Sequence, residues 1–163
     1  MNAQTLIDSF HLAPHPEGGF YARTYAASYS IEYRGCDRPV STAILFLLTS
    51  GQYSRLHRIP QDELWHFYMG GPLRLVVIDP HGGDHEIRLG QNIASGEVLQ
   101  NCVHGGSWFG ATPAEGSAFS LVGCTVSPGF CMEELCLGER DALLAMYPES
   151  AAVIREFCPA EPV

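Results

Sequence analysis

The sequence contains no lysine: its nine positive charges are all arginines, set against 18 aspartates and glutamates. The formal net charge is -9 at pH 7. Lysine-based Schiff-base catalysis is therefore excluded, and an acidic chain disfavours extended contact with nucleic acid or anionic lipid. The composition still permits a local site where one or two arginines hold a single anion, because a guanidinium group matches the oxygens of a carboxylate or phosphate.

Long apolar runs and closely paired cysteines are also missing. No stretch approaches the roughly 20 apolar residues that cross a bilayer, and the N-terminal segment has no basic region followed by an apolar run. We therefore expect a cytoplasmic protein with no membrane partner. The six cysteines include no pair with the two-residue spacing of a zinc ribbon. In the cytoplasm we expect most of them to stay reduced and to pack as small apolar side chains.

Glycine and proline are abundant, with 17 and 11 residues, whereas charged residues make up only 17% of the chain. This profile is typical of many short strands joined by tight turns. A chain of 163 residues is long enough to bury roughly 70% of its unfolded surface, so it needs neither a metal nor a disulfide to fold. We predict a single domain over residues 1–163 in which any bound ion would be functional.

The hydrophobic pattern changes twice along the chain. Residues 2–12 place Leu6, Ile7 and Phe10 on one helical face before APHPEGG ends the helix. The segments ERDALLAMYP and ESAAVIREF near the C-terminus predict two further helices. Between them lie the strand-like runs FYARTYAASYSI, STAILFLLTS, ELWHFYMG, LRLVVID, HEIRLG, EVLQNCV, SWFGAT and FSLVGCTV. Their number and spacing predict an antiparallel sandwich or barrel whose edges the terminal segments cover.

One stretch, GQYSRLHRIPQDELWHFYMGG, has the spacing of half a metal site. Its residues Gly51, His57, Glu63 and Gly70 resemble the first conserved motif of the cupin superfamily, small β-barrels that usually hold a divalent metal. In that motif two histidines and a glutamate face the lumen. The second histidine would stand two places after the first, because alternate residues of a strand face the same side. Ile59 occupies that position here.

The second cupin motif supplies another histidine, and the corresponding stretch here is GEVLQNCVHGGSWFGA, with Phe109 or its neighbours where that ligand would fall. The chain also resembles, over about residues 14 to 148, an uncharacterised cupin-like family of unknown function. The motifs that carry this resemblance are HPEGGFYARTY, STAILFLL, LHRIPQDELWHFYMGGPL, SWFGA, SLVGCTVSPGF and LLAMYP. One departure is His104, where the family pattern has a proline.

The resemblance implies an all-β fold: a cupin double-stranded β-helix, or jelly roll, with a short N-terminal helix and C-terminal helices. It also implies assembly as a homodimer and an internal cavity that takes a small-molecule ligand. It leaves the reaction open, because function depends on the site rather than the fold.

Two potential metal ligands, His57 and Glu63, stand at the expected positions. Zinc and transition-metal sites generally take at least three protein ligands. His66 could be the third only if a β-bulge turned it inward, because its odd separation from Glu63 sends the two side chains to opposite faces of a regular strand. Otherwise we expect His66 to lie outside. The sequence predicts no bound metal or cofactor, with a metal site of His57, Glu63 and His66 as the alternative.

We interpret His57 and Glu63 as a catalytic acid–base pair, because a carboxylate near an imidazole favours its protonated form and can bring the pair into the range useful near neutral pH. Related metal-free cupins epimerise nucleotide sugars with a histidine base and an acidic partner. The resemblance therefore implies a small-molecule-binding cupin that could act as an isomerase or epimerase on a carbohydrate-like or nucleotide-linked ligand. A metal-dependent cupin enzyme and a non-catalytic ligand-binding or sensor module remain alternatives, as does a His57–Glu63 hydrogen bond with no reaction.

Other polar and aromatic side chains are candidate ligand contacts. Tyr21 and Arg23 would project from one side of a strand, and a lumenal Arg23 would hold an anion or pair with Glu17 or Glu134. An aromatic plate near the barrel mouth would suit a ring-bearing ligand. The candidate ligand-binding residues are Tyr21, Arg23, His66, Gln100, Trp108 and Glu134.

Overall fold

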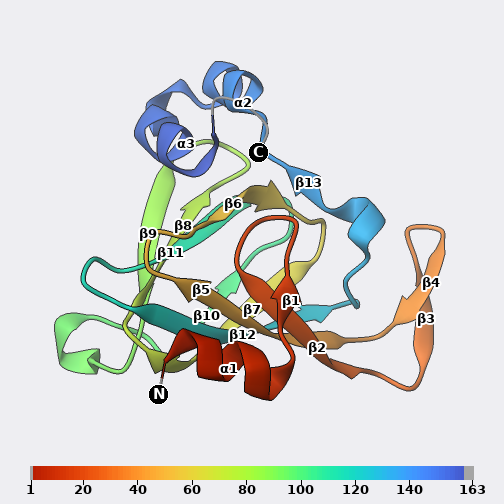
Figure 1. The fold of residues 1–163 in the computed structure, drawn as a ribbon. Helices are drawn as coiled ribbons and strands as arrows, with labels where there is room; N and C mark the ends of the chain where they lie inside the picture. Colours follow the sequence, from red (N-terminus) through yellow and green to blue (C-terminus); the bar gives the residue numbers. More distant parts are fainter. Residues whose placement is uncertain (1, 160–163) are drawn as a thin grey trace.

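A computed structural model describes residues 2–159 of the chain as two antiparallel sheets that pack face to face (Figure 1). The six-stranded sheet has the order β1 (Ala13–Pro14), β2 (Phe20–Ala26), β5 (Thr42–Thr49), β12 (Phe119–Ser127), β7 (Asp62–Gly70) and β10 (Gln100–Val103). The five-stranded sheet has the order β13 (Cys136–Leu137), β6 (Ser54–Arg58), β11 (Trp108–Pro113), β8 (Leu73–Ile78) and β9 (Asp84–Leu89). This arrangement agrees with the predicted jelly roll.

Three α-helices form where the sequence predicts them: α1 (Ala3–Phe10), α2 (Arg140–Met146) and α3 (Ala151–Phe157). Helix α1 begins at Asn2, whose side chain accepts a hydrogen bond from the Thr5 amide at 2.9 Å and so satisfies one free N–H of the first turn. Leu6 packs on Leu47 of the six-stranded sheet. Phe10, expected on the same apolar face, is 42% exposed, since the helix ends there and turns away at His11.

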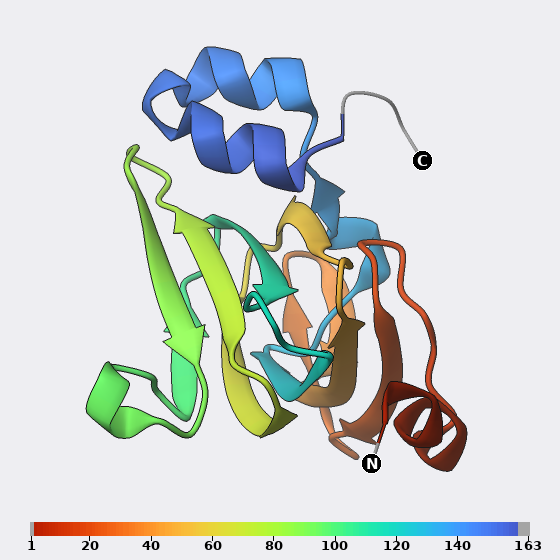
Figure 2. The same ribbon diagram turned by 60° about the vertical axis from the view of Figure 1, so that its left-hand side comes forward.

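Helices α2 and α3 cover the outer face of the five-stranded sheet (Figure 2). Phe157 from α3 packs with Leu56, Val76 and Trp108 from three strands of that sheet. None of the helices within residues 2–159 combines the length and apolar character that a bilayer crossing requires.

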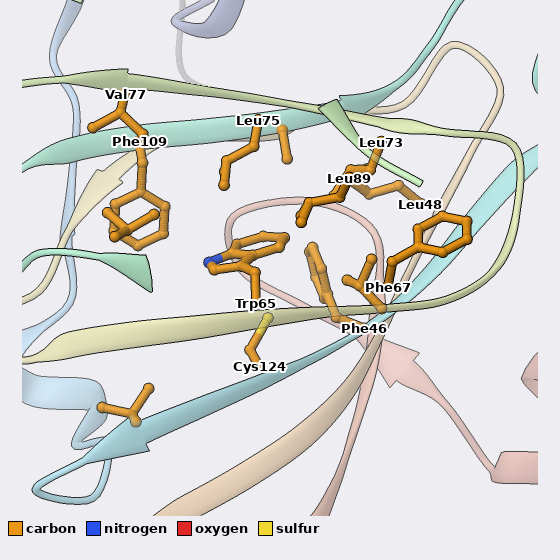
Figure 3. Packing of buried hydrophobic residues seen from close by; sticks show 14 of the residues in the cluster. Phe46, Leu48, Trp65, Phe67, Leu73, Leu75, Val77, Leu89, Phe109 and Cys124 are labelled. Atoms are coloured by element: carbon orange, nitrogen blue, oxygen red, sulfur yellow. The ribbon is translucent and has the colours of Figure 1, made fainter. Parts of the chain in front are cut away.

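The main core lies between the two sheets and centres on Trp65 (Figure 3). Its indole ring meets Phe46 and Phe109 edge to face, with ring centroids 6.0 and 6.2 Å apart. Such contacts between aromatic rings add to the free energy of burial. Phe67, two residues further along β7, joins the same cluster. The same cluster extends to Ile59, Cys124 and Val126, beside Glu63.

The hydrophobic pattern located most strands, but it joined two of them into one run and missed several others, including β6. The run 20–31 is not one strand: β2 ends at Ala26, and residues 30–33 pair with residues 36–39 as a separate hairpin, β3 (Ser30–Tyr33) with β4 (Cys36–Pro39). The pattern missed β6 because this strand has no apolar run. Its polar residues Ser54 and His57 are nevertheless buried, and both contact the same side chain. Their shared partner, Glu17, lies in a loop about 40 residues earlier, which no local pattern reveals.

Candidate functional site

A cavity opens at the Glu63 end of the barrel; it has about 50 Å³ of room for the centres of water-sized groups, and about 590 Å³ of empty space when the open solvent at its mouth is included. Its lining combines titratable groups with apolar walls. The lining residues are His15, Glu17, Tyr21, Arg23, Thr42, Ile44, His57, Ile59, Glu63, Cys124, Val126, Phe130 and Met132. A mostly apolar pocket with a few convergent polar groups is the usual form of a small-molecule site.

Glu17 enters this cavity from the turn between β1 and β2. The His15 amide donates to the Gly19 carbonyl and the Gly18 amide to the His15 carbonyl, both at 3.0 Å. Gly18 and Gly19 have φ angles of 115° and 73°, a region that favours glycine. A Cβ on Gly18 would also lie 2.2 Å from the Tyr53 carbonyl oxygen. The turn is thus held tightly against β6, and it places Glu17 beside His57.

Glu17 and His57 form the central contact of the site. His57 Nε2 lies 3.0 Å from Glu17 Oε2, and His57 Nδ1 lies 2.8 Å from the Arg55 carbonyl oxygen. A carbonyl only accepts, so Nδ1 carries a proton and Nε2 of the neutral ring accepts. The Glu17 contact then requires a proton on the carboxyl group or a second proton on the ring. Ser54 Oγ donates to the other carboxyl oxygen of Glu17 at 3.1 Å.

Burial decides where that proton lies. It raises the pKa of Glu17 to about 8, with the Ser54 hydroxyl opposing the rise, because a buried carboxylate loses its hydration. Burial also lowers the pKa of His57, against the opposing effects of Glu63 and the Arg55 carbonyl. At neutral pH the arrangement is therefore a protonated Glu17 that donates to a neutral His57.

Two further titratable groups adjoin this pair. Burial raises the pKa of Glu63 to about 7; the His57 and Cys124 side chains oppose this rise and the Glu17 charge adds to it. Burial, followed by the proximity of His57, lowers the pKa of His15 to about 4. Around neutral pH the Glu63 carboxyl group is thus near the midpoint of its titration, and the imidazoles of His15 and His57 are neutral.

The expected His57–Glu63 pair needs a correction. Both side chains line the cavity, but within residues 2–159 the carboxyl group that hydrogen-bonds His57 is Glu17, and no hydrogen bond joins His57 to Glu63. The sequence patterns indicated Glu17 only as a possible partner for Arg23. The feature of the sequence that could have indicated this contact is the Gly18–Gly19 turn, which fixes the position of Glu17 just before it.

The cavity does not fit the metal that cupins usually hold. Ile59 and Phe109 occupy two of the ligand positions, and both are buried apolar side chains. Phe109 lies opposite His57 on the paired strands β11 and β6, with ring centroids 4.1 Å apart. In the described part of the chain, no three donor atoms of the cavity lie within 4.8 Å of one another. The cavity offers several donors, but no three of them converge closely enough for a site that needs three protein ligands.

His66 and Gln100 lie outside the cavity. His66 Nε2 is 3.1 Å from Thr125 Oγ1, and its Nδ1 is 2.8 Å from the Gln100 side-chain amide. The ring also stacks on Tyr68, with centroids 6.5 Å apart. Strand β7 does contain an irregularity, but it falls between Phe67 and Met69, beyond His66. His66 therefore stays on the face opposite Glu63 and supplies no third ligand, and Gln100 points away from the predicted barrel mouth.

Trp108 and Glu134 also lie outside the cavity that contains Glu17 and His57. Trp108 is 3% exposed beneath α2 and α3, because these helices cover the outer face of β11. Glu134 accepts hydrogen bonds from Arg38 and Gln61, both at 2.6 Å. Of the six predicted contacts, Tyr21 and Arg23 are the ones that line the cavity.

A family model described as Cupin superfamily (DUF985) matches residues 4–137. The chain belongs to this family. It is 27% identical over 169 residues to an uncharacterized protein of Saccharomyces cerevisiae, an alignment that covers 91% of this chain and 82% of the yeast protein. The family membership confirms the resemblance found in the motifs.

Solved structures confirm the fold. A protein of Shewanella oneidensis matches with a TM-score of 0.91 and 38% identity over 99% of both chains. A hypothetical protein of Leishmania major matches with a TM-score of 0.90 and 35% identity, over 96% of this chain and 98% of that one. An oxalate decarboxylase of Lactobacillus farciminis, at 16% identity and a TM-score of 0.56, covers 96% of this chain and 44% of its own, and this likeness shows the fold alone.

Proposed function

We propose that this cupin binds a small anionic organic ligand and transfers protons on it without a metal, as an isomerase or epimerase of a carbohydrate-like or nucleotide-linked compound. The observation that carries the proposal is the 3.0 Å contact between His57 Nε2 and Glu17 Oε2 at the wall of the cavity. Two groups that share a proton beside a cavity are suited to general acid–base catalysis.

The proposed reaction uses Glu63 as the base. Its carboxylate removes a proton from a ligand carbon next to a carbonyl group, and the C–H electron pair remains on the ligand as an enolate-type anion. The Glu17–His57 pair donates a proton to that anion, either at the opposite face of the same carbon, which gives the epimer, or at the carbonyl oxygen, which gives the enol tautomer. After both transfers Glu63 is protonated and Glu17 is ionised. Proton exchange with solvent restores the starting state.

Arg23 supports an anionic ligand. It lines the cavity, it is exposed, and no ion pair found between residues 2 and 159 includes it. Arg38, by contrast, pairs with Glu134 at 2.6 Å. A guanidinium group at a cavity rim can hold a phosphate or carboxylate of a ligand whose uncharged part lies against the apolar walls.

Deuterium exchange tests this function. The protein is incubated in D₂O with nucleotide sugars, sugar phosphates and small hydroxy acids, and ligand carbon-bound deuterium is followed by NMR. We expect exchange in one of these compounds, loss of exchange in Glu17→Gln and His57→Asn, and no effect of a chelator. His66→Gln is the matched control, because that imidazole lies on the outer face.

Two results would contradict the proposal. Exchange that stops when the protein is treated with chelator would indicate a metal-dependent reaction. Thermal stabilisation by a ligand, with no deuterium incorporated into it, would indicate a binding or sensor module, since any ligand that prefers the folded state stabilises it.

A further inference from the structure

Three side chains that can bind a metal converge outside the cavity, at the edge of the six-stranded sheet. They are Asp62 in β7, Cys102 in β10 and His104, just after β10. One carboxylate oxygen, one sulfur and one ring nitrogen all lie within 4.8 Å of one another. Of the residues from 2 to 159, no other group of three histidine, cysteine or acidic side chains meets this condition.

The strand register explains this convergence. In the antiparallel pair of β10 and β7, Val103 lies opposite Glu63 and Cys102 opposite Leu64. One further step of the same register places His104 opposite Asp62. Val103 is buried in the main core and Glu63 lines the cavity. Because neighbouring residues of a strand face opposite sides, the three donors occupy the outer face and are separate from the Glu17–His57 pair.

The carboxylate of this cluster is already oriented. The Gly105 amide donates to Asp62 Oδ1 at 2.8 Å, and His104 Nδ1 lies 3.5 Å from the same oxygen. Cys102 is half-buried beside them. Burial, together with the Asp62 charge, raises the pKa of the Cys102 thiol. A divalent cation would balance the Asp62 charge.

We propose that Asp62, Cys102 and His104 bind a divalent transition metal with the preferences of Zn²⁺. Sulfur and imidazole ligands favour such ions over Mg²⁺ or Ca²⁺, and three protein ligands leave a fourth position for water. Metal–ligand bonds of about 2.0 to 2.3 Å bring tetrahedral donors to about 3.5 Å from one another. His104 and Asp62, whose side chains are 81% and 59% exposed, can rotate inward to reach that separation.

A bound ion would join the end of β10 to the beginning of β7. Strand β10 forms one edge of its sheet, where fewer hydrogen bonds hold a strand than in the interior. Binding to the folded chain would therefore stabilise it by mass action. This site does not depend on the proposed isomerase activity, and its test requires no substrate.

Titration with Co²⁺ or Zn²⁺ alone tests the site on reduced, metal-stripped protein. We expect one Co²⁺ per chain, with a sulfur-to-metal charge-transfer band in the near ultraviolet. Cys102→Ser should abolish this band, and Asp62→Asn and His104→Gln should each weaken Zn²⁺ binding by on the order of tenfold or more. His104 is so exposed that its variant tests the proposal even if a Cys102 variant folds poorly.

Two variants control for non-specific binding. His85 and Asp79 form an exposed pair with the same 3.5 Å separation, but they belong to no three-donor group in the described chain. His85→Gln should leave affinity and the sulfur band unchanged, as should Cys136→Ser, which removes an exposed thiol. The proposal is overturned if wild-type protein gives no sulfur band, if Cys102→Ser and His104→Gln bind as tightly as wild type, or if Cys136→Ser removes the band.

Discussion

The inner and outer faces of the barrel place histidines in contrasting surroundings. His57 on the inner side is 2% exposed and hydrogen-bonds the Arg55 carbonyl and Glu17. His66 on the outer side is half-buried and contacts Thr125 and Gln100. Both histidines contact neutral polar groups, but of the two only His57 also shares a proton with a buried acid, Glu17. The comparison teaches that the facing direction of a side chain, more than its residue type, determines the chemistry available to it.

Replacement of each histidine by alanine should give the largest difference between the faces. His57→Ala leaves the buried Glu17 carboxyl without its partner and opens a void beside Phe109, so we expect a loss of about 3 kcal/mol of unfolding free energy. His66→Ala should cost about 1 kcal/mol or less. Urea unfolding measures both values. Equal losses would remove the basis of the comparison.

Stability should also depend on pH through Glu17. Its pKa is about 8 in the folded chain against an ordinary value of 4.5, so between these two pH values the folded chain holds a proton that the unfolded chain has released. Unfolding free energy should therefore fall as pH rises from 6.5 to 8, with a contribution from Glu17 of at most about 1.4 kcal/mol per pH unit and a further contribution below about pH 7 from Glu63. Below pH 6.5, His15, with its pKa lowered to about 4, acts in the opposite direction.

Glu17→Gln is the control for this slope. The amide can donate to His57 Nε2 and accept from Ser54, but it does not titrate. Its unfolding free energy should change less between pH 6.5 and 8 than that of the wild type. An unchanged slope in this variant would assign the pH dependence to other groups.

Much of the fold could be predicted, because its signals are local or fixed in spacing. The motif from Gly51 to Gly70 located both His57 and Glu63 on the cavity wall, and the missing imidazole at Ile59 was visible directly. Glu17 was not assigned to His57 because the two residues are about 40 positions apart and a turn brings them together only in the folded chain. Trp108 was misplaced for a related reason: helices from the far end of the chain cover its strand.

A gain of metal binding would sharpen the contrast between the faces. Ile59→His restores the missing histidine of the cupin motif, beside His57 and Glu63. In a Cys102→Ser background, which removes the outer thiol, we expect cobalt affinity to rise by on the order of tenfold. Ile44→His places an imidazole on another wall of the same cavity and should give a smaller gain. Equal gains in the two variants would contradict the expected donor geometry.

The smallest effect concerns the exposed arginines. Once a ligand is identified, Arg23→Gln should weaken it by about fivefold, because one charge-assisted hydrogen bond is lost. Arg88 is also exposed but lies on β9 in the other sheet, so Arg88→Gln should leave affinity unchanged. Calorimetric titration measures both. Equal weakening would indicate a general effect of net charge instead of a contact at the cavity.

The shared proton at Glu17 is tested most directly by infrared difference spectroscopy of wild-type protein against Glu17→Gln. At pH 7 the wild type should show more protonated-carboxyl C=O absorption than the variant, in which Glu63 alone of this pair of acids remains, and the extra band should disappear as the pH rises past about 8. If the two spectra are identical in that region at pH 7, Glu17 is ionised, and the account of a neutral hydrogen-bonded acid beside His57 is wrong.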